Sequence, residues 1–219
     1  MRRDTYLDDR ENSTVKFYGH QRRAGVLIEQ CRILGISEGG RILDIGAADG
    51  RLLTCLAGKF NPETVIALDI DLDYLKRTRT MVPLCVQADG LCLPFPDRII
   101  DLITCTSVLK HITDTGEFLD ECRRVLVQGG GLVISDVVPA VVRAGVRLGY
   151  FLKGSIHSEL SLSELVSQIH DSGFIIVNED RFMISPLPFP GCSLLEKCVR
   201  KLGFKWIMLN HVVSAVRKP

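Results

Sequence analysis

The sequence predicts an α/β fold in which a mostly parallel sheet of seven strands lies between two layers of helices, a three-layer αβα sandwich. Two observations carry this prediction. Short runs rich in leucine and β-branched residues alternate with segments of helical spacing between residues 21 and 135, and this rhythm is typical of parallel strands joined by helical crossovers. The last third of the chain adds two strands, which we expect to form an antiparallel edge.

The expected elements follow the chain in order. The strands are predicted at 41–45, 64–69, 83–87, 99–104, 131–135, 174–178 and 208–216. The helices between them are predicted at 21–34, 50–59, 72–81 and 115–127. Farther on, 139–154 is an apolar helical segment. Ser161 and Glu164 have the spacing of a capping box, which opens another helix that Gly173 ends.

The composition fits a single domain. The chain has 219 residues, of which 46% are hydrophobic and 24% charged, and this suits one compact unit with a sizeable core. We therefore expect residues 1–219 to form one domain. Within it, 1–14 is expected to be a mobile amino terminus, and 139–172 and 186–206 are expected to be insertions on the substrate side that act as a lid.

Charge and cysteine usage narrow the classes of function. A formal net charge of +1 gives the protein no overall electrostatic attraction for a polyanion, so nucleic acid is not an expected partner. The eight cysteines include no CxxC pair and no Cys/His cluster at zinc spacing, which favours buried thiols in a reducing cytosol and no metal. The charged amino terminus lacks a signal peptide's apolar core, and no apolar run approaches the ~20 residues of a membrane span. We expect a cytoplasmic protein.

The stretch RILDIGAADG, residues 41–50, is the most informative motif. A dinucleotide-binding turn has glycine at the first, third and sixth places of its loop. Counting from Gly46, the third place is Ala48 and the sixth is Arg51. Carboxylates at Asp44 and Asp49 would repel a pyrophosphate, whereas they suit a ligand that carries an ammonium and a sulfonium. The loop therefore predicts a cationic or zwitterionic ligand.

Further acids follow the next two strands. The second strand ends at Asp69, where a carboxylate can bind both hydroxyls of a ribose through short hydrogen bonds. This feature is shared by nucleotide-binding enzymes of several kinds. The third strand leads into Ala88, Asp89 and Gly90, where a carboxylate can accept a hydrogen bond from an adenine amino group.

Taken in order, these residues resemble the class I S-adenosylmethionine-dependent methyltransferases. The resemblance covers about residues 15–180 and departs at Ala48, where the family loop commonly has a middle glycine. It implies a Rossmann-like sheet in strand order 3-2-1-4-5-7-6 with strand 7 antiparallel. It also implies S-adenosylmethionine as cofactor and S-adenosylhomocysteine as product. The motifs that carry it are 43–50, Asp69, 88–89, 93–95, Asp101, 108–112, 123–126 and 129–136.

The resemblance also implies roles for individual residues. Asp44 would hold the ammonium of the methionine moiety, Asp69 the ribose and Asp89 the adenine. Small residues of the loop would wrap the methionine moiety with backbone groups, and residues after the fourth strand would line the floor near the methyl group. The expected cofactor-binding set is Tyr18, Arg23, Asp44, Gly46, Ala47, Ala48, Gly50, Asp69, Ile70, Ala88, Asp89, Gly90, Cys105 and Val108.

Methyl transfer requires in-line placement of a nucleophile, exclusion of water and, for some acceptors, a base. The candidate bases are His111, Tyr150 and His157, with ordinary packing roles as the alternative for each. Residues 104–107 read TCTS, without the Asn/Asp-Pro-Pro-Tyr signature or the Pro-Cys nucleophile of enzymes that methylate DNA bases. A small-molecule acceptor is the expectation that remains.

Three questions stay open at this level. Apolar residues in 141–152 and a basic amphipathic stretch at 194–206 suit a hydrophobic acceptor or peripheral contact with an anionic membrane, whereas core packing and solvation explain them more simply. A catalytically silent protein that binds the cofactor as a partner or regulatory subunit would share the same residues. A nicotinamide-dependent oxidoreductase is disfavoured by the loop, and the oligomeric state is unknown.

Overall fold

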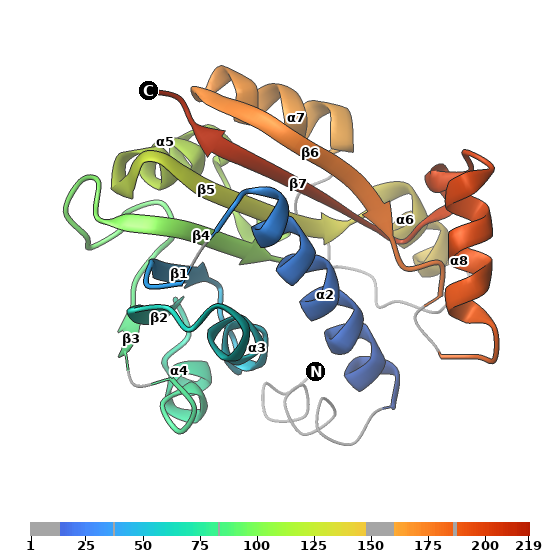
Figure 1. Ribbon diagram of the computed structural model, residues 1–219, viewed down its shortest axis with the longest axis horizontal. Helices are drawn as coiled ribbons and strands as arrows, with labels where there is room; N and C mark the ends of the chain where they lie inside the picture. The colour runs from blue at the N-terminus through green and yellow to red at the C-terminus, as the bar shows by residue number, and fades with distance from the viewer. Residues whose placement is uncertain (1–13, 37, 83, 148–159, 186–187) are drawn as a thin grey trace.

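The computed structural model describes residues 14–36, 38–82, 84–147, 160–185 and 188–219. In this part of the chain, seven strands form one sheet in the order β3-β2-β1-β4-β5-β7-β6 (Figure 1). Strand β7 is antiparallel to β5 and β6, and the other pairings are parallel. The expected fold class, strand order and antiparallel strand are confirmed.

Most elements begin or end within a few residues of their expected bounds. The strands are β1 Arg41–Ile45, β2 Thr64–Asp69, β3 Leu84–Gln87, β4 Ile100–Thr106, β5 Leu126–Val137, β6 Phe174–Phe182 and β7 Asn210–Arg217. The helices are α2 Thr14–Ile33, α3 Arg51–Phe60, α4 Leu72–Thr78, α5 Thr115–Val125, α6 Pro139–Arg147, α7 Leu162–Asp171 and α8 Cys192–Lys201, with short 3-10 turns η1 Leu109–His111 and η2 Lys205–Ile207.

The differences have physical causes. The helix predicted to end at residue 127 ends at Val125, because Leu126 is extended and pairs directly with Ile100 of β4. The helix predicted from residue 21 begins at Thr14. Of residues 1–14, which the sequence predicts to be mobile, 1–13 lie outside the described residues and Thr14 begins α2. The candidate bases Tyr150 and His157 also lie outside the described residues.

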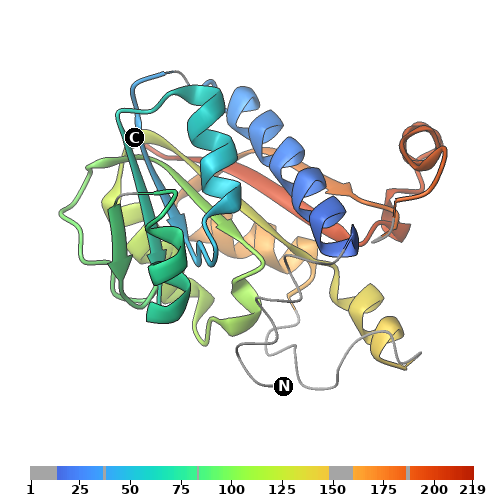
Figure 2. The same ribbon diagram turned by 90° about the horizontal axis from the view of Figure 1, so that it is seen from below.

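The sheet has a hydrophobic core on each of its two faces, because successive side chains of a strand point to opposite faces of a sheet. Helices α2, α3 and α4 cover one face, where Ile42 packs with the buried leucines of those helices. Helices α5 and α7 cover the other face, where Leu43 packs near Phe118 and Ile169. Figure 2 shows α2 and α3 on one side of the sheet and α5 and α7 on the other.

The last part of the segment 139–172, residues 160–172, contributes to this layer. Ser161 Oγ accepts a hydrogen bond from the Glu164 amide (3.2 Å), and the Glu164 carboxylate accepts one from the Ser161 amide (2.7 Å). The predicted capping box is confirmed. Leu165 and Ile169 of α7 are fully buried in the core, so this part of the segment belongs to the helical layer. Among the described helices, none is both long and apolar enough to cross a membrane.

The sheet places several loops at one edge. Strands β1 to β5 are parallel, so their carboxyl ends meet at the same side of the molecule. The strand order reverses between β1 and β4, and ligands of open α/β sheets bind beside such a reversal. The loops at 46–50, 70–71, 88–92 and 107–108 all follow strands at this edge.

Candidate ligand site at the carboxyl edge of the sheet

The loop after β1 is tightly curved. Gly46, Ala48 and Gly50 all have positive φ, of +72°, +47° and +72°. A Cβ on Gly46 would lie 2.2 Å from Val108 Cγ2, and a Cβ on Gly50 would lie 2.6 Å from Thr78 Cγ2. Both glycines are therefore required by backbone conformation and by close packing. Ala48 also has a positive φ, which glycine adopts more easily than alanine. A glycine at this position would therefore be favoured by the backbone conformation, whether or not the ligand has a pyrophosphate.

Two neighbouring elements hold this loop in place. The Ala48 amide donates a hydrogen bond to Asp69 Oδ2 (2.9 Å), and Thr78 Oγ1 donates one to the Ala48 carbonyl (2.6 Å). Asp69 also accepts a hydrogen bond from the Asp71 amide through Oδ1 (2.9 Å). The end of β2 and the end of α4 thus fix the loop that follows β1. Sequence reasoning missed the role of Thr78.

Three buried carboxylates surround the loop: Asp44, Asp49 and Asp69. Burial, together with the charges of Asp69 and Asp49, raises the pKa of Asp44 to about 7, although the hydrogen bond from Thr104 (2.6 Å) opposes the shift. Burial also raises the pKa of Asp69, against the backbone hydrogen bonds that it accepts from Asp71, Ala48 and Ile70. Asp49 forms an ion pair with Arg51 (3.6 Å), whereas Asp44 and Asp69 form none with the described residues. Such a site favours a positively charged ligand.

The end of β3 and the loop after β2 form the second side of the site. Ile70 directly follows Asp69 and is 68% exposed. Asp89 is exposed, and its Oδ1 accepts a hydrogen bond from the Leu91 amide (3.0 Å). Gly90 is buried, with room for a Cβ only at 3.4 Å from Ile45 and Phe118. The apolar side chain of Ile70 and the carboxylate of Asp89 therefore follow the ends of the neighbouring strands β2 and β3. Ala88, directly after β3, is half-buried.

Unpaired polar atoms mark the ends of β4, β5 and β7 at the same edge. Thr106 pairs in register with Ser135, and Asp136 with His211. Ser107 has a positive φ of +61°, and its amide donates a hydrogen bond to the Ser135 carbonyl (2.7 Å). The buried atoms here that have no hydrogen-bond partner among the described residues are Thr106 Oγ1, Ser107 Oγ, Ser135 Oγ, His211 Nδ1 and both amide atoms of Asn210.

This polar edge, defined as Thr106, Ser107, Ser135, Asn210 and His211, suits a ligand with hydrogen-bonding groups. A buried polar atom that makes no hydrogen bond costs about 1–3 kcal/mol, so several together are uncommon in packed cores. Backbone strain at a non-glycine residue such as Ser107 also clusters at functional sites. Sequence reasoning missed these residues, although hydroxyl and amide side chains inside apolar strand sequences were a signal.

The remaining expected residues lie in different surroundings. Val108 contacts the loop at Gly46. Cys105 is fully buried in the core on the α5 face, and burial raises its pKa well above the ordinary thiol value. The thiol therefore lies beneath the site. The Tyr18 hydroxyl lies 3.3 Å from Cys192 Sγ of α8, and Arg23 is half-buried on α2. Ala47 is buried in the core under the loop.

His111 lies on η1, is exposed, and lines a cavity of about 690 Å³ on the α5 and α7 side of the sheet. Gln168 of α7 lines the same cavity and has a buried Oε1 atom with no hydrogen-bond partner among the described residues. The lining residues are His111, Ile112, Thr113, Asp114, Thr115, Gly116, Leu160 and Gln168. In the described part of the chain, no group of three or more His, Cys, Asp or Glu residues could hold a metal ion.

Known proteins share the central part of this sequence. Residues 43–134 match the model of a methyltransferase domain family. A demethylmenaquinone methyltransferase of Tropheryma whipplei (strain Twist) is 31% identical over 135 residues, which are 58% of this chain and 53% of that protein. A fatty-acid O-methyltransferase of Mycolicibacterium smegmatis is 33% identical over 106 residues, which are 47% of this chain and 39% of that protein. The chain spans about half the length, or less, of these curated relatives.

The fold recurs in solved structures. An S-adenosylmethionine-dependent methyltransferase from Mesorhizobium loti has a TM-score of 0.68 and 20% sequence identity, over 86% of this chain and 96% of that one. At this level of identity the likeness establishes the shared fold and leaves the chemistry to be argued from the site.

Proposed function

We propose that this chain, whose residues 43–134 match a methyltransferase domain family, transfers a methyl group from S-adenosylmethionine to a small-molecule acceptor. One observation carries the proposal: Asp44, Asp49 and Asp69 are buried around a loop that has no side chain at Gly46 or Gly50. The ligand that fits must be positively charged and must approach the backbone closely. S-adenosylmethionine meets both conditions, since it carries an ammonium, a sulfonium and a nucleoside.

The described residues fit each part of this cofactor. Asp44 lies at the end of β1, two residues before Gly46, and would hold the ammonium, directly or through water. Asp69 would bind the ribose hydroxyls, because each carboxylate oxygen has two lone pairs and only one per oxygen is used by a backbone amide. Ile70 would pack against the adenine ring, and Asp89 would accept a hydrogen bond from its amino group.

Cofactor binding would involve a proton at Asp44. Its pKa lies at about 7 in the absence of a cation, so an appreciable fraction of the carboxyl groups is protonated at neutral pH. An ammonium within hydrogen-bonding distance favours the ionised form and lowers this pKa. Binding would therefore release a proton from the fraction of Asp44 that is protonated, and the ligand would neutralise the carboxylate charge.

The cofactor supplies an activated methyl group, and the chain supplies placement. In the transfer, the bond from sulfur to the methyl carbon breaks, sulfur keeps the electron pair, and the acceptor atom forms the new bond and loses its proton if it carried one. The polar edge lies beside Val108 and would orient the acceptor through hydrogen bonds. His111, which lines the cavity of about 690 Å³, is the base candidate among the described residues, and Tyr150 and His157 remain sequence-based candidates.

Two further points support a small acceptor. The named activities of the relatives concern demethylmenaquinone and fatty acids, both small molecules. The polar edge is built from hydroxyl, amide and imidazole groups, which can form hydrogen bonds with a polar group of the acceptor. A hydrophobic acceptor with one polar, reacting end combines both features. Nucleic acid as the acceptor lacks support from the net charge of +1.

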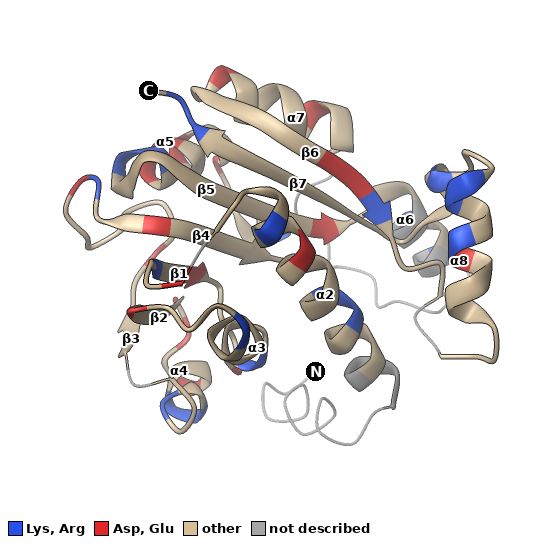
Figure 3. Ribbon diagram, in the orientation of Figure 1, with Lys and Arg blue, Asp and Glu red and all other residues tan. Residues whose placement is uncertain are grey.

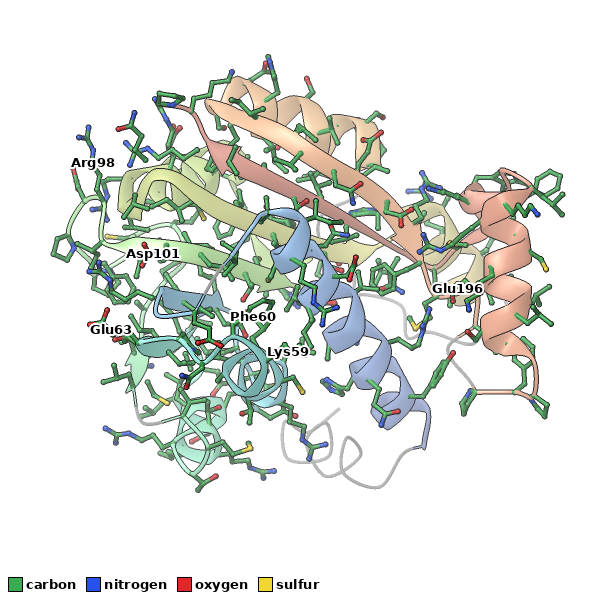
Figure 4. All side chains as sticks on the ribbon, in the orientation of Figure 1. Lys59, Phe60, Glu63, Arg98, Asp101 and Glu196 are labelled. Carbon is green, nitrogen blue, oxygen red and sulfur yellow. The ribbon has the colours of Figure 1, made fainter. Side chains whose placement is uncertain are left out.

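Ligand binding tests the cofactor assignment. Thermal unfolding is measured with S-adenosylmethionine, S-adenosylhomocysteine and NAD, and the first two are expected to stabilise the protein by RT ln(1 + [L]/Kd). Asp69→Asn should remove this stabilisation, because the ribose loses its carboxylate. Glu63→Gln is the matched control, since Glu63 is an exposed acid just before β2 (Figure 4). Stabilisation by NAD alone would overturn the proposal.

Turnover separates an enzyme from a silent binder. The protein is incubated with cofactor labelled in its methyl group and with demethylmenaquinone or a free fatty acid as acceptor. Label that moves into an organic-soluble product supports the proposed reaction. Cofactor binding with no transfer to these acceptors or to a total lipid and metabolite extract would favour the regulatory alternative.

A further inference from the structure

Exposed apolar side chains are concentrated in α8 and the residues that flank it. Thirteen large apolar side chains are exposed in the described part of the chain, and six of them fall within 189–206. Leu194, Leu202 and Trp206 are each 67–68% exposed, although free energy favours burying such residues. The six, which with α8 define the α8 surface, are Phe189, Leu194, Leu195, Leu202, Phe204 and Trp206.

The exposed face of α8 is distinct from its buried face. Cys192, Glu196 and Val199 are buried and lie toward the rest of the protein. Leu195 and Leu202, seven residues apart, share another face, because side chains at that spacing lie in line on a helix. Since the helix already has a buried side, its apolar outward side has no role in packing this chain among the described residues.

Polar contacts hold α8 in this orientation. Arg22 of α2 donates a hydrogen bond to Glu196 Oε1 (2.6 Å) on the inward side of the helix (Figure 4). Arg200 forms an ion pair with Asp180 of β6, and Lys205 Nζ lies 3.0 Å from the same carboxylate. Figure 1 shows α8 at one end of the sheet, standing clear of the strands. The apolar face is therefore presented outward by a fixed helix.

The charges near α8 help to decide whether a protein or a lipid bilayer would cover its exposed apolar side chains. Residues 188–207 contain four bases and a single acid, Glu196, which is buried. Lys197 and Lys201 are exposed and form no ion pair with any described residue. Figure 3 marks several positions along the α8 ribbon as Lys or Arg. Lysine is depleted at the centre of protein interfaces, whereas an apolar face with lysines and aromatic residues at its border is typical of helices that lie on anionic bilayers.

We propose that the α8 surface docks on the headgroup region of an anionic lipid bilayer. The leucines and Trp206 enter the boundary between headgroups and acyl chains, and Lys197 and Lys201 pair with lipid phosphates. Strand β7 begins at Asn210, shortly after Trp206, so the polar edge lies close in sequence to the docked surface. The docking itself does not depend on the proposed methyl transfer.

Vesicle flotation with the full chain tests the proposal. We expect the protein to float with vesicles of phosphatidylcholine and phosphatidylglycerol, to float poorly with phosphatidylcholine alone, and to be released by high salt. Lys197→Gln with Lys201→Gln should weaken binding roughly twenty-fold, because each lysine near an anionic surface contributes about five-fold. Leu202→Asp with Trp206→Ala should abolish flotation.

The control is Leu84→Asp, since Leu84 is 50% exposed on edge strand β3, and this variant should float like the unaltered protein. Thermal unfolding with S-adenosylhomocysteine is measured for every variant to establish that the fold is intact. A protein that does not float with anionic vesicles would overturn the proposal. So would a dimer that Leu202→Asp converts to monomer, because a second copy would then cover the surface. Absence of any response to S-adenosylhomocysteine would contradict the proposed function and leave the flotation result unaffected.

Discussion

The amide of Ala48 donates a hydrogen bond of 2.9 Å to the Asp69 carboxylate while the Ala48 backbone holds a φ of +47°. The acid that ends β2 thus shapes the loop that follows β1, in addition to its proposed contact with ribose. Because a left-handed conformation is unfavourable for alanine by about 1 kcal/mol, this hydrogen bond helps to stabilise a strained residue. The loop is therefore formed before any ligand binds.

Ala48→Gly is expected to increase stability by about 0.5–1 kcal/mol, since glycine adopts positive φ without a steric cost and the gain exceeds its entropy loss. The free energy of unfolding in urea measures the effect. Ala57→Gly in α3 provides the control, and it should lower stability by about 1 kcal/mol as glycine does inside helices. A decrease for both variants would show that the conformation at Ala48 carries no strain.

Gly46→Ala is expected to destabilise the protein by about 2–4 kcal/mol, because the new Cβ is both overpacked and held at positive φ. The clash is specific, since that Cβ would lie 2.2 Å from Val108 Cγ2. Adding Val108→Ala to Gly46→Ala should recover part of the loss, and a double-mutant cycle measures the coupling. Strict additivity of the two substitutions would contradict the proposed contact.

Asp44→Asn is expected to stabilise the ligand-free protein at pH 8, on the order of 3 kcal/mol. The unfolded pKa of an aspartate is about 3.9, and burial raises the folded pKa to about 7. The contribution of Asp44 to stability is therefore fully present below the unfolded pKa and is lost as pH rises through about 7. Urea unfolding between pH 5 and 8 should show a smaller decline for Asp44→Asn, whose amide oxygen can still accept the Thr104 hydrogen bond. Parallel pH profiles would exclude this role.

Affinity for S-adenosylmethionine is expected to fall as pH drops below about 7, by up to ten-fold per pH unit, because the ligand binds the ionised form of Asp44. Calorimetry in buffers of different ionisation enthalpy counts the protons released on binding. Asp44→Asn should abolish the release and weaken binding at pH 8. If the variant released as many protons as the unaltered protein, another group would be responsible.

Local sequence determined much of the architecture. The bounds of β1 and β2 follow from short apolar runs that have an acid at or next to their last residue, and the start of α7 follows from its capping box. The strand order was predicted from the family resemblance. That resemblance rests on a series of motifs in constant order, which is more specific than any single motif. The loop at 46–50 could be assigned from the identities of its small residues, since few residues tolerate positive φ.

Tertiary structure alone decided which side chains meet. Thr104 donates to Asp44 across 60 residues of chain, and Arg22 donates to Glu196 across 174. Neither contact has a local signature, because strand register and helix packing bring these residues together. The same holds for Leu126, which continues an apolar helical pattern and yet pairs with Ile100 in the sheet. The periodicity of a sequence indicates which face of a helix or strand is buried. The buried carboxylates, the polar edge and the outward α8 surface depend instead on residues from distant parts of the chain that the fold brings together.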